Sequence, residues 1–343
     1  MNELDRILPN IHSRAGDLDR SGNWPEQDLR DLAALGANRW FVRQQFGGDG
    51  VDPLELHLRY EAIASASVSV ALILSQRDSA VGFIEGGENS ALREELLPQL
   101  ARGEFFSTIG IAQLTTSRQG GLRATSHGDG YRLNGLIPWS TGAAVAKYVV
   151  AGAVTDDQRQ MLFVLPTGLS GVQVKPPLEL VALRSTWTSQ IELNDVHLES
   201  RWILRGPMEK VLSRSSKGLP LGQIFLAFGL CKGALELIQE EGSERARSLH
   251  EKFAYQLGSI RGEVLELCKP GNEAAAGAAA PRVRASCHDL AIRITQSTVA
   301  LYKGSALLMD HPAQRLAREA MFFLVWSCPD PVIDCTVNVL SEG

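Results

Sequence analysis

The stretch IPWSTGAAVAKYVVAG, residues 137–152, joins a corner to the start of an apolar, β-branched run. Pro138 cannot donate a backbone hydrogen bond, and a Gly-Ala-Ala turn follows shortly after it. The run at 148–150 is typical of a buried strand. An indole and two hydroxyls meet at this corner, from Trp139, Ser140 and Thr141. The stretch predicts a β-region that turns at an aromatic and polar corner.

The segments on both sides of this stretch keep the same character from about residue 108 to residue 205. They are short alternating or β-branched runs, such as QMLFVLP at 160–166. Turn sequences separate them, for example at 127–130, where His127 is expected at a hairpin tip. We therefore predict a central β-domain over 108–205, either a barrel or a sandwich.

Helical patterns flank this β-region on both sides. Residues 1–107 are predicted to form an N-terminal helical domain, in which 52–76 reads as one long helix capped by Asp52. A shorter helix is expected after a cap at Asn89 or Ser90. Residues 213–343 are predicted to form a C-terminal helical bundle.

Two segments of the predicted bundle differ in composition from the rest. The segment CKPGNEAAAGAAAPR, at 268–282, is rich in Ala, Gly and Pro and is interpreted as a linker between helices. The last expected helix is PAQRLAREAMFFLVW, at 312–326. The fold class is thus an α+β chain of several domains, without an evident internal repeat.

Composition excludes several function classes for this chain of 343 residues. The net charge of −5 and the scattered Lys and Arg residues argue against a nucleic-acid partner. No run of about 18 apolar residues occurs, so we expect no membrane span. The N-terminus lacks an apolar signal core, which favours a cytoplasmic protein. Five cysteines without a CxxC pair indicate reduced thiols, with no metal site and no disulfide framework.

Five segments, in chain order, are similar to motifs of the acyl-CoA dehydrogenase family of flavoproteins. FGGDGVDPLEL resembles the YGG-x-G segment ahead of a helix, and FSTIGIAQLTTS takes the place of the A-x-TEP strand. YRLNGLIPWSTGA resembles G-x-K-x-WITNG, and LRSTWTSQIELNDVHL resembles LG-x-RGS-x-T followed by F-x-D-V-x-V. KGSALLMDHPAQRLAREA resembles the GG-x-G and RDA region. The resemblance covers nearly the whole chain.

This resemblance implies a helical N-domain, a central β-barrel and a C-terminal four-helix bundle that associates into homodimers or homotetramers. It also implies a flavin, FAD in most members, and an acyl thioester substrate. Trp139 would pack against the flavin ring, and Thr141, next to Ser140, would bond the N5 edge. A strand that contains Gln113, Leu114 and Thr115 would supply backbone and hydroxyl hydrogen bonds to the pyrimidine edge of the flavin. A packed core Trp beside a Ser/Thr turn is the alternative interpretation of the corner.

The sequence departs from the family where the catalytic carboxylate is expected. Counting nine residues from Arg318, in the place of the family's RDA arginine, reaches Ser327, with Trp326 in the place of a tyrosine. Ser327 cannot remove an α-proton as a carboxylate can, so both residues are expected only to line the substrate pocket. An alternative family position, near Leu219, also lacks an acid. Asp330, expected in a loop between two prolines, is a candidate for a displaced base.

The phosphate-binding motifs are altered as well. The family's TEPxAGSD turn has no acid here, and Arg118 within it could hold a phosphate or carboxylate of the substrate, or be solvated. The family's R-x-x-FG segment is shortened in 243–258, where Arg245 or Arg247 could substitute for its arginine. FAD is the cofactor that the resemblance implies, and these departures make FMN the alternative.

Two further functions stay open. The corner PWSTGA also resembles a branch of the superfold that uses reduced FMN as a monooxygenase, although His311, the nearest histidine, reads as a helix-entry residue. A non-catalytic relative that binds or assembles without flavin is the third reading. Arg315 and Arg318, three residues apart on a helix, are expected to hold an interface by salt bridges.

Overall fold

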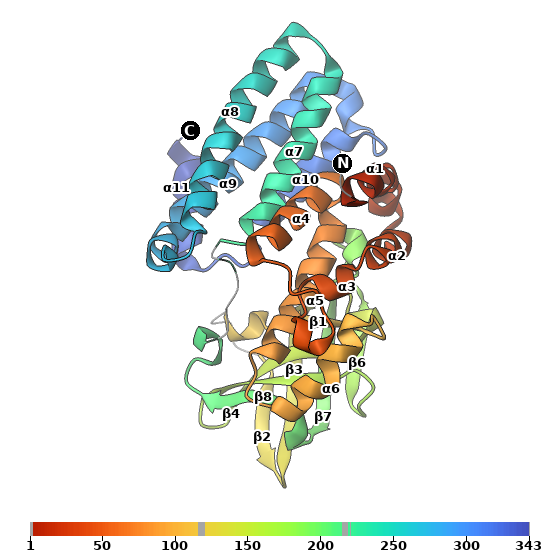
Figure 1. Ribbon diagram of the computed structural model, residues 1–343, viewed down its shortest axis with the longest axis vertical. Coiled ribbons are helices and arrows are strands. Elements are labelled where there is room, and N and C mark those ends of the chain that lie inside the picture. Colours follow the sequence, from red (N-terminus) through yellow and green to blue (C-terminus); the bar gives the residue numbers. More distant parts are fainter. Residues whose placement is uncertain (1–2, 116–120, 215–218, 220, 343) are drawn as a thin grey trace.

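A computed structural model describes residues 3–115, 121–214, 219 and 221–342 of the chain. Helices occupy both ends of the sequence, and a sheet lies between them in the sequence. In Figure 1 the C-terminal helices form the upper part and the strands the lower part, with α4 and α5 between them. The predicted order of helices, β-domain and helices is confirmed.

In the N-terminal part, the described residues form six α-helices. They are α1 (Glu3–Ser21), α2 (Glu26–Ala34), α3 (Ala37–Trp40), α4 (Pro53–Ala66), α5 (Val68–Glu85) and α6 (Ser90–Ala101). The predicted caps are in place: Asp52 accepts from the backbone N–H of Leu54 at 2.9 Å, and Asn89 accepts from that of Leu92 at 3.0 Å.

The prediction of a single long helix over 52–76 is wrong. Ser67 takes an extended conformation, with φ −156° and ψ 110°, and separates α4 from α5. Its hydroxyl accepts from the backbone N–H of Val70, so Ser67 serves as the N-cap of the second helix. The apolar pattern runs through the break because both helices are buried, and periodicity alone therefore did not show it.

The described residues of the central part form one eight-stranded sheet. Its strands are β1 (Phe106–Gly110), β2 (Arg123–His127), β3 (Gly130–Ser140), β4 (Ala146–Thr155), β5 (Gln160–Pro166), β6 (Val172–Pro177), β7 (Ser189–Leu198) and β8 (Ile203–Met208). The hydrogen-bonded order is β6-β7-β3-β2-β4-β5-β8, and β1 pairs with β4 in parallel. His127 pairs with Gly130 across the β2–β3 turn, which confirms its place at a hairpin tip.

From residue 221 to residue 342 the structure describes five α-helices: α7 (Ile224–Glu241), α8 (Glu244–Leu267), α9 (Glu273–Tyr302), α10 (Pro312–Phe323) and α11 (Asp330–Glu342). The linker predicted over 268–282 is wrong in its larger part, because α9 begins at Glu273. Alanine is the strongest helix former, and the alanine-rich stretch forms the first turns of this helix. Helix α11 was not predicted, because Pro331 reads as a breaker although a proline fits the first turn of a helix.

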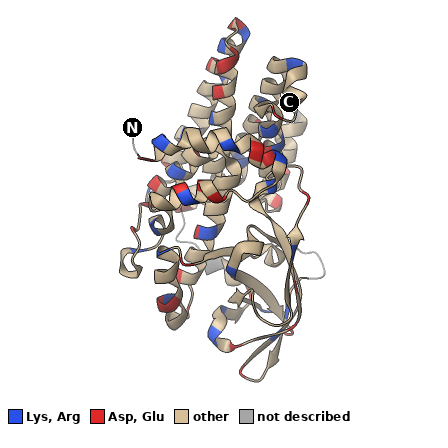
Figure 2. Ribbon diagram, turned by 90° about the vertical axis from the view of Figure 1, so that its right-hand side faces the viewer, with Lys and Arg blue, Asp and Glu red and all other residues tan. Residues whose placement is uncertain are grey.

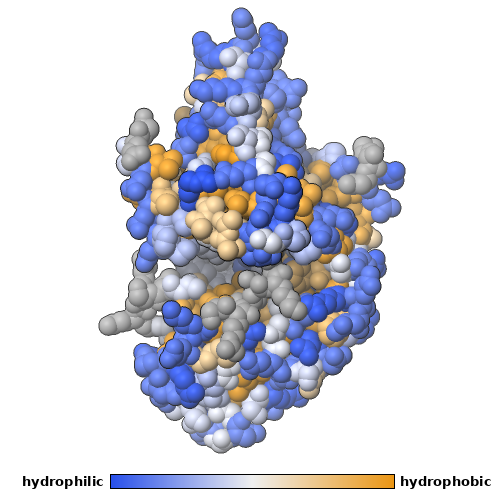
Figure 3. Space-filling view, turned by 60° about the vertical axis from the view of Figure 1, so that its left-hand side comes forward, coloured by the Kyte–Doolittle hydropathy of each residue, from blue (hydrophilic) through white to orange (hydrophobic). Residues whose placement is uncertain are grey.

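Two hydrophobic cores meet along helix α5. Its first half, from Val68 to Leu74, packs with α4 and the C-terminal helices, whereas Ala80, Val81 and Ile84 pack with the sheet and α6. Helix α5 thereby fixes the bundle against the sheet. Figure 3 shows the surface hollowed at the level where these two parts meet, with apolar side chains on both sides.

Charged side chains are interspersed along the helices in the view of Figure 2. The five cysteines are not joined in disulfides, and three of them, Cys231, Cys268 and Cys287, are buried as small core residues. Among the helices that the structure describes, none combines the length and the apolar character needed to cross a bilayer.

Candidate functional site

The corner after strand β3 exposes an indole above two buried hydroxyls. Pro138 lies within β3, where the register with β7 shifts between Ile137 and Ser140. Trp139 is 52% exposed, whereas Ser140 and Thr141 are buried. A large aromatic side chain held open to solvent on a buried turn offers a flat apolar face to a ligand. The alternative interpretation of Trp139 as a packed core residue does not fit this exposure.

The two hydroxyls differ in how they are bonded. Ser140 Oγ donates to the Ile109 carbonyl at 3.1 Å and ties the corner to strand β1. Thr141 Oγ1 lies 3.4 Å from Thr188 Oγ1, at the long limit of a hydrogen bond. Thr188 is better paired with Thr186 Oγ1, at 2.8 Å. Ser140 is thus structural, and the hydroxyl of Thr141 keeps most of its capacity to bond a ligand.

Gly142 makes this corner possible. It has φ +65°, a conformation that favours glycine, and its N–H donates to the Thr186 carbonyl at 2.9 Å. A Cβ at this position would lie 2.8 Å from the Phe106 ring and 2.9 Å from the Trp24 ring. Trp24 in turn contacts Phe106 and Trp187. The aromatic cluster of Trp24, Phe106 and Trp187 therefore packs against the corner.

Residues 112–115 lie beside the corner but not in the predicted strand. Strand β1 ends at Gly110, and Ala112–Leu114 forms a 3₁₀-helix that packs on β3 and β4. The strand prediction is wrong because the Gln113 carboxamide turns inward and donates to the carbonyls of Gly110 and Gly152, at 2.9 and 2.8 Å. Its Oε1 is buried and has no partner among the described residues. Thr115 is exposed.

The expected substrate-pocket residues of the bundle lie in the turn after α10. Trp326 stacks on Phe322, with ring centroids 5.1 Å apart, and its carbonyl accepts from Arg284 Nη2 at 3.0 Å. Ser327 is exposed and has φ +50°. In the described part of the chain, no hydrogen bond or ring contact joins Trp326 or Ser327 to the corner at 139–141.

Three other expectations concern charged groups. Asp330 is not a loop residue but the first residue of α11, where a carboxylate is favoured by the helix dipole. Arg118 lies outside the described residues. Arg245 and Arg247 are exposed in the first turns of α8, and only Gly242 and Ser243 connect α7 to α8.

The interpretation of His311 as a helix-entry residue is confirmed, because it is the N-cap of α10 and its Nδ1 accepts from the Ala313 N–H at 3.2 Å. The expectation that two arginines hold an interface is confirmed for Arg318, which pairs with Asp19 of α1. It is wrong for Arg315, which pairs with Glu319 of its own helix. The structure adds a buried polar group in the bundle that sequence reasoning missed, because His288 carries no motif. Burial, followed by the charge of Arg284, lowers the pKa of His288 to about 4.

Comparisons with known proteins agree with this architecture. Residues 7–104 match the family described as acyl-CoA dehydrogenase, N-terminal domain. The probable acyl-CoA dehydrogenase YngJ of Bacillus subtilis is 24% identical over 340 residues, which cover 90% of this chain and 88% of that protein.

Two solved structures share the fold over almost the whole chain. Butyryl-CoA dehydrogenase from Megasphaera elsdenii superposes with a TM-score of 0.83 at 20% identity, covering 99% of this chain and 98% of that one. TdsC of Paenibacillus sp. A11-2, a dibenzothiophene monooxygenase, superposes in its FMN-bound form with a TM-score of 0.84 at 17% identity, covering 99% and 97%.

Proposed function

Because this chain has the acyl-CoA dehydrogenase fold and an acyl-CoA dehydrogenase N-terminal domain, we propose that it is a flavin-dependent oxidoreductase acting on an acyl-CoA or a related acyl thioester. Relatives named acyl-CoA dehydrogenases support the substrate class. A bound flavin supplies the redox chemistry, because it accepts two electrons as a hydride. The residues of this chain would bind and orient it.

The observation that carries the proposal is the half-exposed indole of Trp139 on a turn that buries Thr141. Trp139 would cover one face of the flavin ring, and Thr141 Oγ1 would bond a ring nitrogen. Gln113 Oε1, a buried acceptor without a described partner, fits a ring N–H, although it needs a small rearrangement to reach one. Leu114 and Thr115 would border the same edge of the ring.

FAD is the proposed form of the cofactor, and FMN is the alternative. Arg245 and Arg247, exposed in the first turns of α8, are the candidates for holding the adenosine diphosphate half of FAD. The FMN-bound state of TdsC favours the alternative. Chromatography of the flavin released by acid from the purified protein distinguishes the two. A colourless protein that takes up neither flavin would instead indicate a non-catalytic relative.

Replacing Trp139 with alanine is expected to weaken flavin binding by about 1–3 kcal/mol, by analogy with aromatic stacking on bases. That loss corresponds to a dissociation constant about 5- to 150-fold higher. Fluorescence titration of the apoprotein with FAD and with FMN measures it. Trp139→Phe, which keeps a smaller aromatic face, is the matched control and should lose much less. Equal affinities for the wild type and Trp139→Ala would remove Trp139 from the site.

We further propose that this protein oxidises saturated acyl-CoA slowly. General-base catalysis contributes about 10²–10⁴-fold in rate, and Ser327 is an exposed hydroxyl that cannot supply it. Anaerobic mixing with a saturated acyl-CoA should therefore bleach the flavin slowly, and Ser327→Glu should accelerate bleaching if the carboxylate reaches the substrate. Fast bleaching by the wild type would show that another base exists, and Asp330→Asn would then test the candidate at the start of α11.

A reduced-flavin monooxygenase is the second candidate function. The likeness to TdsC and the missing carboxylate favour it. Consumption of oxygen that depends on added reduced FMN would support this candidate against the dehydrogenase.

We also infer a homodimer or homotetramer in the cytoplasm. Ile333, Val337 and Leu340 of α11 are exposed and lie four and three residues apart, so they share one face of the helix. An apolar helix face of this kind is typical of an interface. Light scattering on the purified protein measures the oligomeric state.

A further inference from the structure

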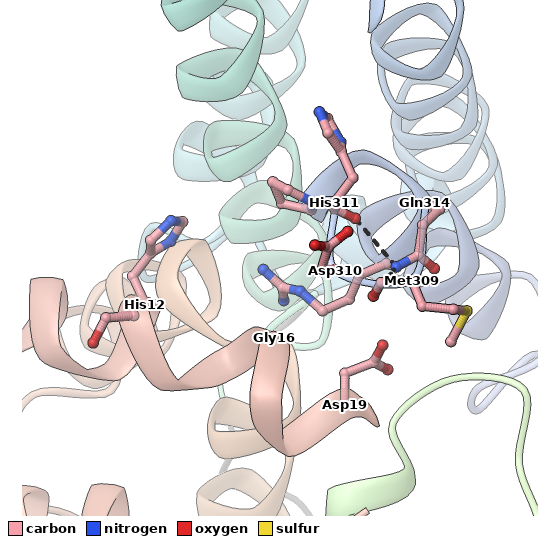
Figure 4. A pocket seen from close by; sticks show the side chains of 10 residues that line it. His12, Gly16, Asp19, Met309, Asp310, His311 and Gln314 are labelled. Atoms are coloured by element: carbon pink, nitrogen blue, oxygen red, sulfur yellow. Dashed lines mark hydrogen bonds between the residues drawn. The ribbon is translucent and has the colours of Figure 1, made fainter. Parts of the chain in front are cut away.

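A hollow of about 200 Å³ lies between α1 and the entry of α10, apart from the corner that would hold the flavin. Helix α1 lines it with His12, Ser13, Gly16 and Asp19, and the other wall is the segment 309–315. Figure 4 shows His12 and Asp19 on one side and Asp310, His311 and Gln314 on the other. The wall of α1 is open at Gly16, where the nearest side-chain atom to an added Cβ is Arg20 Nη1, at 3.6 Å.

Arg315 is a buried cation in the lining of this hollow. Its side chain is 5% exposed. Nη1 lies 3.3 and 3.4 Å from the two carboxylate oxygens of Glu319, and Nε has no partner among the described residues. A guanidinium has five N–H donors, and leaving buried donors unpaired is costly. An acceptor in the hollow could bond the guanidinium.

The acidic groups nearby compensate Arg315 only in part. Both carboxylate oxygens of Asp19 already accept from Arg318. Burial raises the pKa of Glu319, against the attraction of Arg315, and so favours its neutral form. Asp310 is exposed on the loop and is the one lining acid without a described ion pair. The rings of His12 and His311 add possible donors on opposite walls.

The positive end of a helix points to the same place. The residues from His311 to Arg315 are the N-cap and the first turn of α10, a helix of 12 residues. Backbone N–H groups of a first turn lack partners within the helix and favour an anion. The Gln314 carboxamide donates to the carbonyls of Met309 and His311, at 3.0 and 3.1 Å, and holds this wall in place.

We propose that this hollow binds a small anion, a phosphate or carboxylate group, through Arg315 and the first turn of α10. The volume lies below the roughly 300–1,000 Å³ of pockets for drug-sized ligands, so one small anionic group fits it. The residues that line this hollow do not include those proposed above to hold the flavin or to line the acyl substrate pocket. An anion bound in this hollow would contact both α1 and α10.

Titration calorimetry of the full chain tests the site, with sodium phosphate and sodium acetate in separate arms and sodium chloride at equal ionic strength as the reference. Arg315→Met is expected to weaken binding by about tenfold or more, because hydrogen bonds to charged groups are lost. Gly16→Leu should block the hollow from α1 while leaving Arg315 and Glu319 intact. Gly258→Leu, on α8 where no described side chain lies within 4 Å of an added Cβ, is the matched control and should bind as the wild type does.

Binding of phosphate alone, acetate alone or both, with loss in Gly16→Leu and not in Gly258→Leu, supports the proposal and selects the anion. Hydrogen exchange of α1 should then slow when the anion binds. Absence of binding to the wild type, or equal affinities in Gly16→Leu and Gly258→Leu, overturns it. Because Gly16→Leu leaves Arg315 in place, it tests the proposal even if Arg315→Met fails to fold.

Discussion

Replacing Arg318 with methionine is expected to lower the free energy of unfolding by about 3–5 kcal/mol, the usual cost of breaking a buried ion pair from one side. The side chain of Asp19 is only 5% exposed, and both its carboxylate oxygens accept from Arg318. Without Arg318 this carboxylate stays buried and unpaired. The variant also loses the bond from Nη1 to the Val181 carbonyl, at 2.6 Å.

Urea unfolding measures this loss, and an exposed pair provides the control. Arg30 and Glu26 form an i,i+4 pair whose side chains are 67% and 65% exposed, so Arg30→Met should cost about 0.5 kcal/mol or less. The double variant Asp19→Asn with Arg318→Met should recover part of the stability, because no buried charge is left alone. A cost for Arg318→Met no larger than that for Arg30→Met would contradict the buried pair.

This ion pair shows what spacing in the sequence reveals and what it hides. Two arginines three residues apart on an apolar-periodic helix predicted ion pairs at an interface, and the structure confirms this for Arg318 but pairs Arg315 within its own helix. The partner Asp19 lies 299 residues away, and no local pattern links it to Arg318. Helix periodicity tells which side chains share a face, whereas the identity of the facing residue depends on how α1 and α10 pack.

The errors in the helices have a common physical cause. Apolar periodicity passes unchanged through Ser67, because both α4 and α5 are buried, so one helix was expected where two exist. The alanine-rich start of α9 reads as low complexity, although alanine favours a helix more than any other residue. At such places the composition and the apolar pattern predict different structures, and tertiary packing determines which structure forms.

The candidate flavin corner was predicted from motif resemblance, and only the structure shows how its side chains are buried and bonded. The sequence shows Trp139 beside two hydroxyls but not that the indole is exposed while Thr141 keeps a weakly bonded hydroxyl. The inward turn of Gln113 was equally hidden, because its two carbonyl partners lie on different strands.

Acidification is expected to destabilise this protein through His288, a buried histidine of α9. The pKa of His288 is lowered to about 4, first by burial and then by the charge of Arg284, whereas an unfolded histidine titrates near 6.5. As the pH falls below about 6.5, the unfolded chain takes up a proton that the folded protein does not. The free energy of unfolding therefore falls until about pH 4, by about 3 kcal/mol at about 1.4 kcal/mol per pKa unit, and then levels off.

His288→Met separates this contribution from those of the other titrating groups, because methionine fills a similar apolar space without a proton to gain. Urea unfolding is measured between about pH 7 and pH 4, a range that spans the pKa values of His288 in the unfolded and the folded state. The loss of stability over this range should be smaller by about 3 kcal/mol in this variant than in the wild type. His127→Gln, at the exposed β2–β3 hairpin tip, should keep the full pH dependence. Parallel stability curves for His288→Met and the wild type would mean that His288 takes up its proton as easily in the folded state as in the unfolded chain, which would contradict a lowered pKa.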